Sequence, residues 1–231
     1  MSELRVALVA EGPTDAVVIE AALKALLPRS FVLTLLQPES TAIERGGGWG
    51  GVLRWCLAFA ERGSATFEAD PTMPGFDLFV IHADADVAEC SYGDVSRDVA
   101  DIAERRGWSA LPSPQSCPPP GASADVVRAC LLDWAGLGQA GRKTVICVPS
   151  KAIDAWLVAA VLPDGHKLLT NLECKLNVAS QAESLPKGQR IRKAVKCYRD
   201  YAPTITAEWS VVRARCTQAE RFSTDVETAF Q

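Results

Sequence analysis

Short, nearly continuous apolar runs alternate with segments of helical periodicity over most of this chain. The apolar runs hold many β-branched residues, which favours buried strands, and we predict these at 4–10, 31–36, 77–82 and 144–148. Apolar positions recur at helical spacing between them, and we predict helices at 14–27, 52–62, 94–106, 124–137 and 150–161. Buried strands separated by helices are typical of a mainly parallel sheet covered on both faces.

The chain is therefore predicted to be an α/β protein with a core over residues 1–165 and a helical extension of two or three helices over 166–231. Two segments of biased composition, Gly46–Gly51 and the proline-rich Leu111–Ser123, are expected to be loops. No Gly-Lys-Ser/Thr follows the glycine segment, so it is not a P-loop, and we expect no ATP hydrolysis by this chain alone.

Composition narrows the class of protein further. The 231 residues are 48% hydrophobic and 23% charged, with a net charge of −4, which is ordinary for a globular protein and not basic enough to indicate a general affinity for nucleic acid. The N-terminus lacks the pattern of a signal peptide and the apolar runs are too short to span a bilayer, so we expect a cytoplasmic protein without membrane contact. The eight cysteines form no CxxC pair, and we expect them to be reduced and mostly buried rather than zinc ligands.

Acidic residues stand where the predicted strands end. Glu11 closes the first strand, Asp84 and Asp86 close the third, and Asp154 follows the fourth by about one helical turn. Because parallel strands end at one edge of a sheet, these carboxylates can converge there. Mg²⁺ prefers a few carboxylates together with water and phosphate oxygens, and Mn²⁺ takes similar ligands, so the pattern predicts a divalent metal site.

Simpler interpretations exist for several of these residues. Asp15 follows Thr14 at a helix start, where a carboxylate interacts well with the helix dipole and Thr can cap free N–H groups. Asp84 and Asp86 can make local turns. Lys151 lies near the end of the fourth strand, where it can stabilise phosphoryl charge or simply face solvent, and His82 is expected to be buried and neutral.

The segments VALVAEGPTD (6–15) and LFVIHADAD (78–86) resemble the TOPRIM domain of type IA and II topoisomerases, DnaG-type primases and OLD-family nucleases. SKAIDAWLVA (150–159) further resembles small stand-alone TOPRIM-like proteins of bacterial anti-phage systems, which are paired with an ABC- or SMC-type ATPase. The resemblance covers about residues 4–161. It implies a TOPRIM-like sheet of four mainly parallel strands.

The resemblance also implies roles for individual residues. Glu11 would be a metal ligand or general acid/base, and Asp84 and Asp86 would hold Mg²⁺ or Mn²⁺. Asp15 and Asp154 match positions that nuclease-type members fill with acids, for a second metal. This chain departs from the family pattern after Asp86, where Val87 stands in place of the usual glycine or nearby acid. Glu89, two residues further on, is a candidate outer ligand of the metal. The chain has no separate domain with a nucleophilic tyrosine, so topoisomerase activity is not expected.

The segment Lys187–Arg199 carries six basic residues and no acid. Placed on a helix, its apolar residues Ile191, Ala194, Val195 and Tyr198 would share one side. The opposite side would then hold Arg190, Arg192, Lys193, Lys196 and Arg199, which together with Lys187 are the candidate nucleic-acid-binding residues. Such a face can be merely solvated, can contact the phosphates of a nucleic acid, or can dock an acidic partner.

These observations together predict a Mg²⁺-dependent nuclease that cuts DNA or RNA, including tRNA, as the toxic effector of an anti-phage system. Two alternatives remain open: a non-catalytic module that binds an ATPase partner or nucleic acid, and another Mg²⁺-dependent phosphotransfer enzyme. The sequence does not decide between a monomer and a homodimer.

Overall fold

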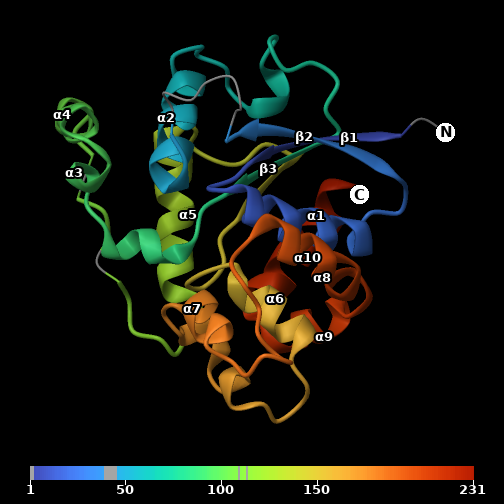
Figure 1. The fold of residues 1–231 in the computed structure, drawn as a ribbon. Coiled ribbons are helices and arrows are strands. Elements are labelled where there is room, and N and C mark those ends of the chain that lie inside the picture. Colours follow the sequence, from blue (N-terminus) through green and yellow to red (C-terminus); the bar gives the residue numbers. More distant parts are fainter. Residues whose placement is uncertain (1–2, 39–45, 109, 113) are drawn as a thin grey trace.

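A wholly parallel, four-stranded sheet in the order β2-β1-β3-β4 lies at the centre of the fold (Figure 1). The computed structural model describes residues 3–38, 46–108, 110–112 and 114–231. The strands are β1 (Leu4–Val9), β2 (Phe31–Gln37), β3 (Leu78–His82) and β4 (Thr144–Cys147). The α/β class and all four strand predictions are confirmed, and the sheet is consistent with a TOPRIM-like fold.

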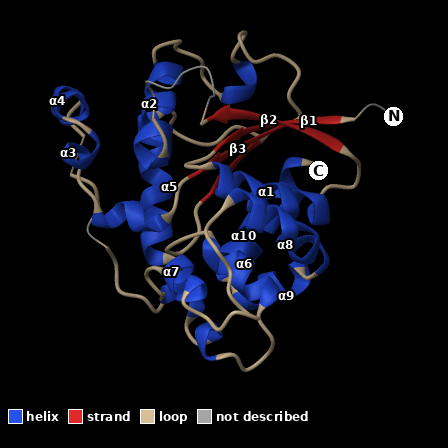
Figure 2. Ribbon diagram, in the orientation of Figure 1, coloured by secondary structure: helices blue, strands red, loops and turns tan. Residues whose placement is uncertain are grey.

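Helices cover both faces of the sheet (Figure 2). Successive strand residues point to opposite faces, and because both sets are apolar, each face needs a covering layer. Val6, Leu8 and Val80 belong to one apolar cluster, whereas their neighbours Ala7 and Ile81 belong to the other. The first cluster is completed by helices that include α1 (Pro13–Leu26), α6 (Asp154–Val161) and several from the C-terminal segment. The second cluster is completed mainly by α2 (Gly48–Ala60) and α5 (Ala122–Trp134).

The C-terminal segment is part of the layer that covers the first face of the sheet. It contains four α-helices, more than the two or three expected: α7 (Val178–Glu183), α8 (Val195–Ala207), α9 (Trp209–Arg215) and α10 (Thr217–Ala229). Its buried side chains lie in the same cluster as Val6 and Leu8, so the apolar core runs across residue 165. Helix α8 packs along α1, where the Thr206 hydroxyl donates to the Ala21 carbonyl at 2.8 Å. Among the described residues no helix is both long and apolar enough to cross a membrane.

Three helix predictions were wrong in their extent, and one of them is the helix expected over 150–161, which begins only at Asp154. The helix expected over 94–106 is two helices, α3 (Tyr92–Val95) and α4 (Arg97–Arg105), because Ser96 is extended and caps α4 by accepting from the Val99 amide at 3.3 Å. Helix α2 begins within the glycine segment, where a Cβ at Gly51 would lie 2.6 Å from the Gly46 carbonyl oxygen. Glycine permits this close approach of two backbone segments.

Cys117 and Cys174 are joined by a disulfide, so the expectation that the cysteines are reduced was wrong for this pair. The bond anchors the proline-rich segment to the C-terminal part of the chain across 57 residues of sequence. Nothing in the local sequence around either cysteine indicates the other, because only the tertiary fold brings them together. The remaining six cysteines are free, and three of them are buried.

Candidate metal centre

Three carboxylates meet at the carboxyl ends of β1 and β3, which are adjacent in the sheet. One oxygen from each of Glu11, Asp84 and Asp86 lies within 4.8 Å of the others. Glu11 is partly buried, Asp84 is buried and Asp86 is exposed, so the group lies at the surface with one side in the protein. The convergence predicted from the strand ends is thus present in the structure.

Backbone hydrogen bonds fix Asp84 at the centre of this group. Its amide donates to Glu11 Oε1 at 2.7 Å, and its Oδ1 accepts from the Ile153 amide at 2.9 Å. A backbone hydrogen bond also joins the turn after β3 to the turn after β4: the Asp86 amide donates to the Lys151 carbonyl at 3.2 Å. The loops of three different strand ends therefore hold the three carboxylates in place.

The glycine segment before α2 supports Glu11 from outside the sheet. The Gly48 amide donates to the Glu11 carbonyl at 2.8 Å, and a Cβ at Gly47 would lie 3.6 Å from the same oxygen. Gly48 has a φ of 67°, which favours glycine. This segment, which has no phosphate-binding motif, serves here to position the residue that closes β1.

Burial, and then repulsion from neighbouring carboxylates, raises the pKa of each of the three carboxyl groups. Burial and then the Asp84 charge raise the pKa of Glu11 from its ordinary 4.5 to about 8, although the nearby His82 and the Asp84 amide act to lower it. Burial and then the charges of neighbouring aspartates hold the pKa of Asp84 well above its usual range. The pKa of Asp86 is also raised, first by burial and then by Glu89. Near neutral pH the cluster thus retains protons that a divalent cation would displace.

Asp15 and Asp154 lie close enough to Asp84 to raise its pKa. They do not belong to the group of three carboxylates that converge within 4.8 Å among the described residues. Asp15 is buried in the first turn of α1, where Gly12 is the N-cap; the expected cap by Thr14 was wrong, and the Thr14 hydroxyl instead donates to Asp15 Oδ1 at 3.2 Å. Asp154 begins α6 and is 2% exposed. Both of its oxygens have partners: Oδ1 accepts from the Tyr198 hydroxyl, and Oδ2 lies 3.1 Å from Lys193 Nζ.

Lys151, Glu89 and His82 flank the carboxylates. Lys151 is buried, and its Nζ donates to Glu89 Oε1 at 2.9 Å, so these two residues pair with each other. His82 is buried as expected, with Nε2 at 3.2 Å from Asp84 Oδ1. Its Nδ1 has no hydrogen-bond partner within the described part of the chain.

The helix considered over Lys187–Arg199 is formed only from Val195 onward. Residues 187–194 are irregular and α8 begins only at Val195, because Ala194 is extended. Lys187, Arg190 and Arg192 are exposed on the irregular part, where Arg190 Nε also donates to the Leu185 carbonyl at 3.2 Å. Lys196 and Arg199 are exposed on α8, whereas Lys193 turns toward Asp154. The six basic residues therefore do not form one helix face.

Tyr198 is the residue at this site that sequence reasoning missed. From the sequence it is placed among the apolar residues on one side of the Lys187–Arg199 segment, which does not indicate a contact to Asp154. It lies 44 positions after Asp154, and only the packing of α8 near α6 brings its hydroxyl to that carboxylate. No local pattern could have revealed this contact.

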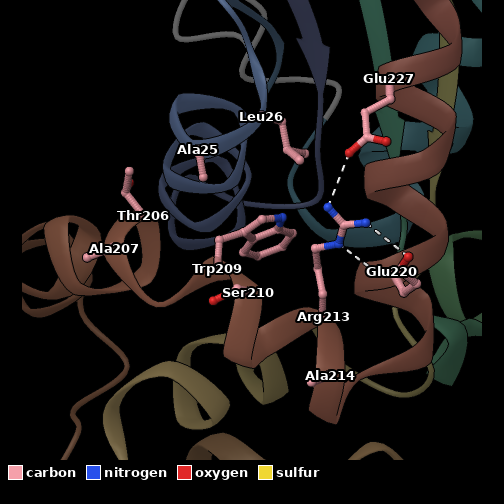
Figure 3. A pocket seen from close by; sticks show the side chains of 10 residues that line it. All are labelled: Ala25, Leu26, Thr206, Ala207, Trp209, Ser210, Arg213, Ala214, Glu220 and Glu227. Carbon is pink, nitrogen blue, oxygen red and sulfur yellow. Dashed lines mark hydrogen bonds and ion pairs between the residues drawn. The ribbon is translucent and has the colours of Figure 1, made fainter.

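The cavity in Figure 3, of about 610 Å³, is a different feature between the end of α1, the α8–α9 junction and α10. Among the described residues that line it, the cation is Arg213, which already pairs with two acids: Nε lies 2.5 Å from Glu220 and Nη1 lies 3.1 Å from Glu227. None of the strand-end carboxylates lines it. Its charges are thus largely compensated within the protein.

Comparisons of this chain with models of protein families, with curated proteins and with solved structures found no match. The likeness to TOPRIM proteins therefore stands on the motifs at the ends of β1, β3 and β4.

Proposed function

We propose that this chain is a Mg²⁺- or Mn²⁺-dependent nuclease whose metal is held by Glu11, Asp84 and Asp86. The observation that carries the proposal is the convergence of these three carboxylates, of which Glu11 has a pKa of about 8. Crowded carboxylates retain protons in the absence of a cation, and a hard divalent cation with oxygen ligands relieves the same repulsion.

A phosphodiester is the substrate class that fits such a site best. Asp86 is exposed, so a cation bound here would keep positions open to solvent and to a phosphate oxygen. When bound, the metal would polarise the phosphoryl group and lower the pKa of a coordinated water. The chain's own part is to orient the ligands, through the Asp84 amide on Glu11 and the Ile153 amide on Asp84.

The exposed basic residues support a polyanionic substrate. Lys187, Arg190 and Arg192 are exposed and lie within six residues of Lys193, which pairs with Asp154 beside the proposed metal site. Contacts of this kind to phosphates are independent of sequence and weaken with salt. The anti-phage setting and the ATPase partner follow from the TOPRIM resemblance and complete the proposal.

A cleavage assay tests this function. The protein, alone and with a neighbouring ATPase if its gene context provides one, is incubated with plasmid, single-stranded DNA and tRNA in Mg²⁺ or Mn²⁺. We expect metal-dependent cleavage that falls at least about 100-fold in Glu11→Gln and Asp86→Asn, because each removes a ligand charge. Asp98→Asn, an exposed acid on α4, is the matched control and should cleave normally.

Two other results would redirect the proposal. Cleavage that persists in both ligand variants would show that the chemistry is elsewhere. Metal binding and nucleic-acid binding without cleavage of any substrate would favour the non-catalytic module.

A further inference from the structure

The buried Asp154 is held by two residues of the C-terminal segment. The Tyr198 hydroxyl donates to its Oδ1, and Lys193 Nζ lies 3.1 Å from its Oδ2. Asp154 and Tyr198 are 2% and 1% exposed, whereas half of the Lys193 side chain is accessible. The ammonium group therefore approaches the acids from the solvent side, while the carboxylate that receives it is fixed within the protein.

The charge of Lys193 acts on more than one acid. Burial acts to lower the pKa of Lys193, but Asp154 and then Asp15 and Asp84 outweigh it, so that the pKa is raised. In return, Lys193 acts to lower the pKa of Asp15 and of Asp86, both of which burial raises. The ammonium group thus interacts electrostatically with Asp15, Asp84, Asp86 and Asp154.

The two sides of the acidic cluster differ in what neutralises them. His82 acts to lower the pKa of acids on both sides, of Glu11 as well as of Asp15, whereas the ion pair of Lys193 is with Asp154. On the Glu11 side, Lys151 pairs with Glu89 and also acts to lower the pKa of Asp86. A divalent cation added next to the Lys193 ammonium would be repelled by it, and would compete with it for the oxygens of Asp154.

We infer that Lys193 is the resident counter-ion of the Asp15–Asp154 side, and that the cluster consequently binds a single divalent cation, at Glu11, Asp84 and Asp86. The inference rests on the proposed metal function. It departs from the two-metal arrangement that the TOPRIM resemblance implies, because an ammonium group takes the place of the second ion.

Counting bound Mn²⁺ on the full chain tests this inference. Free Mn²⁺ is measured by electron paramagnetic resonance during titration of the wild type, Lys193→Met, Lys193→Arg and Lys196→Met. We expect about one ion per chain in the wild type and about one more in Lys193→Met, because the methionine removes the ammonium that pairs with Asp154. Lys193→Arg keeps the charge and should match the wild type. Lys196→Met removes an exposed lysine of α8 and is the matched control.

The two hypotheses fail in different ways. The wild-type count tests the metal function, and a count of zero would overturn it. The difference between Lys193→Met and the wild type tests the counter-ion, and no gain would overturn that. Two ions in the wild type would retain the metal function and refute the counter-ion. If Lys193→Met does not fold by circular dichroism, Lys193→Gln, which also removes the charge, replaces it and is judged by the same count.

Discussion

The Glu11 side and the Asp15–Asp154 side of the acidic cluster are built from the same residue types and meet at Asp84, yet they are stabilised differently. On the Glu11 side, three carboxylates converge within 4.8 Å and backbone amides of the protein orient them. On the other side, Asp154 is satisfied by a tyrosine hydroxyl and a lysine ammonium. The difference shows that the number of acidic residues in a cluster does not give the number of metal ions that it binds, because a lysine side chain can take the place of a metal ion.

Replacing Asp84 should have the largest effect on this comparison, since Asp84 interacts with both sides. Asp84→Asn keeps an oxygen that can accept from the Ile153 amide but loses the charge. We expect Mn²⁺ affinity to fall at least about 100-fold. The melting temperature of the metal-free protein should rise, because the folded state no longer has to keep Asp84 protonated or bury its charge among other carboxylates. Calorimetric titration and thermal unfolding measure the two effects, with Asp98→Asn as the control. An unchanged affinity would remove Asp84 from the site.

The pH should have the next largest effect. Because a bound cation must displace the proton from Glu11, Mn²⁺ affinity should rise about tenfold per pH unit until about pH 8 and then level off. For the metal-free protein the sign is opposite. The folded state keeps a proton that the unfolded chain releases above pH 4.5, so Glu11 makes the stability fall between pH 4.5 and about 8. Titrations from pH 6 to 9 test this, and the affinity of Glu11→Gln should depend much less on pH. A wild-type affinity that is flat across this range would contradict the raised pKa.

Asp154→Asn should have the smallest effect on the metal. The amide retains an acceptor for the Tyr198 hydroxyl and loses only the ion pair with Lys193. We expect the affinity for the first Mn²⁺ to change by less than about threefold. The free energy of unfolding should fall by about 1 kcal/mol, because Lys193 is half exposed and the pair is partly screened. A loss of metal affinity as large as that of Asp84→Asn would make Asp154 a ligand and end the distinction between the two sides.

Much of the fold could be predicted from local pattern. All four strands and most of the helices followed from apolar runs and helical spacing, since burial on one or both faces leaves a periodic trace. The split at Ser96 and the start of α2 at Gly48 did not follow, because an extended residue and a close backbone contact leave no such trace. The basic segment Lys187–Arg199 was an error of the opposite kind. Its pattern of basic and apolar residues is compatible with a helix over its whole length, but the helix begins only at Val195.

By itself the sequence determined the parallel sheet and the meeting of Glu11, Asp84 and Asp86, because parallel strands must end at one edge and these residues close two of them. Tertiary structure alone decided what each carboxylate touches. The Lys193 and Tyr198 contacts to Asp154, the Lys151–Glu89 pair and the Cys117–Cys174 bond join residues 39 to 62 positions apart. Such contacts depend on how loops and helices pack, and packing over that distance leaves no pattern in the local sequence.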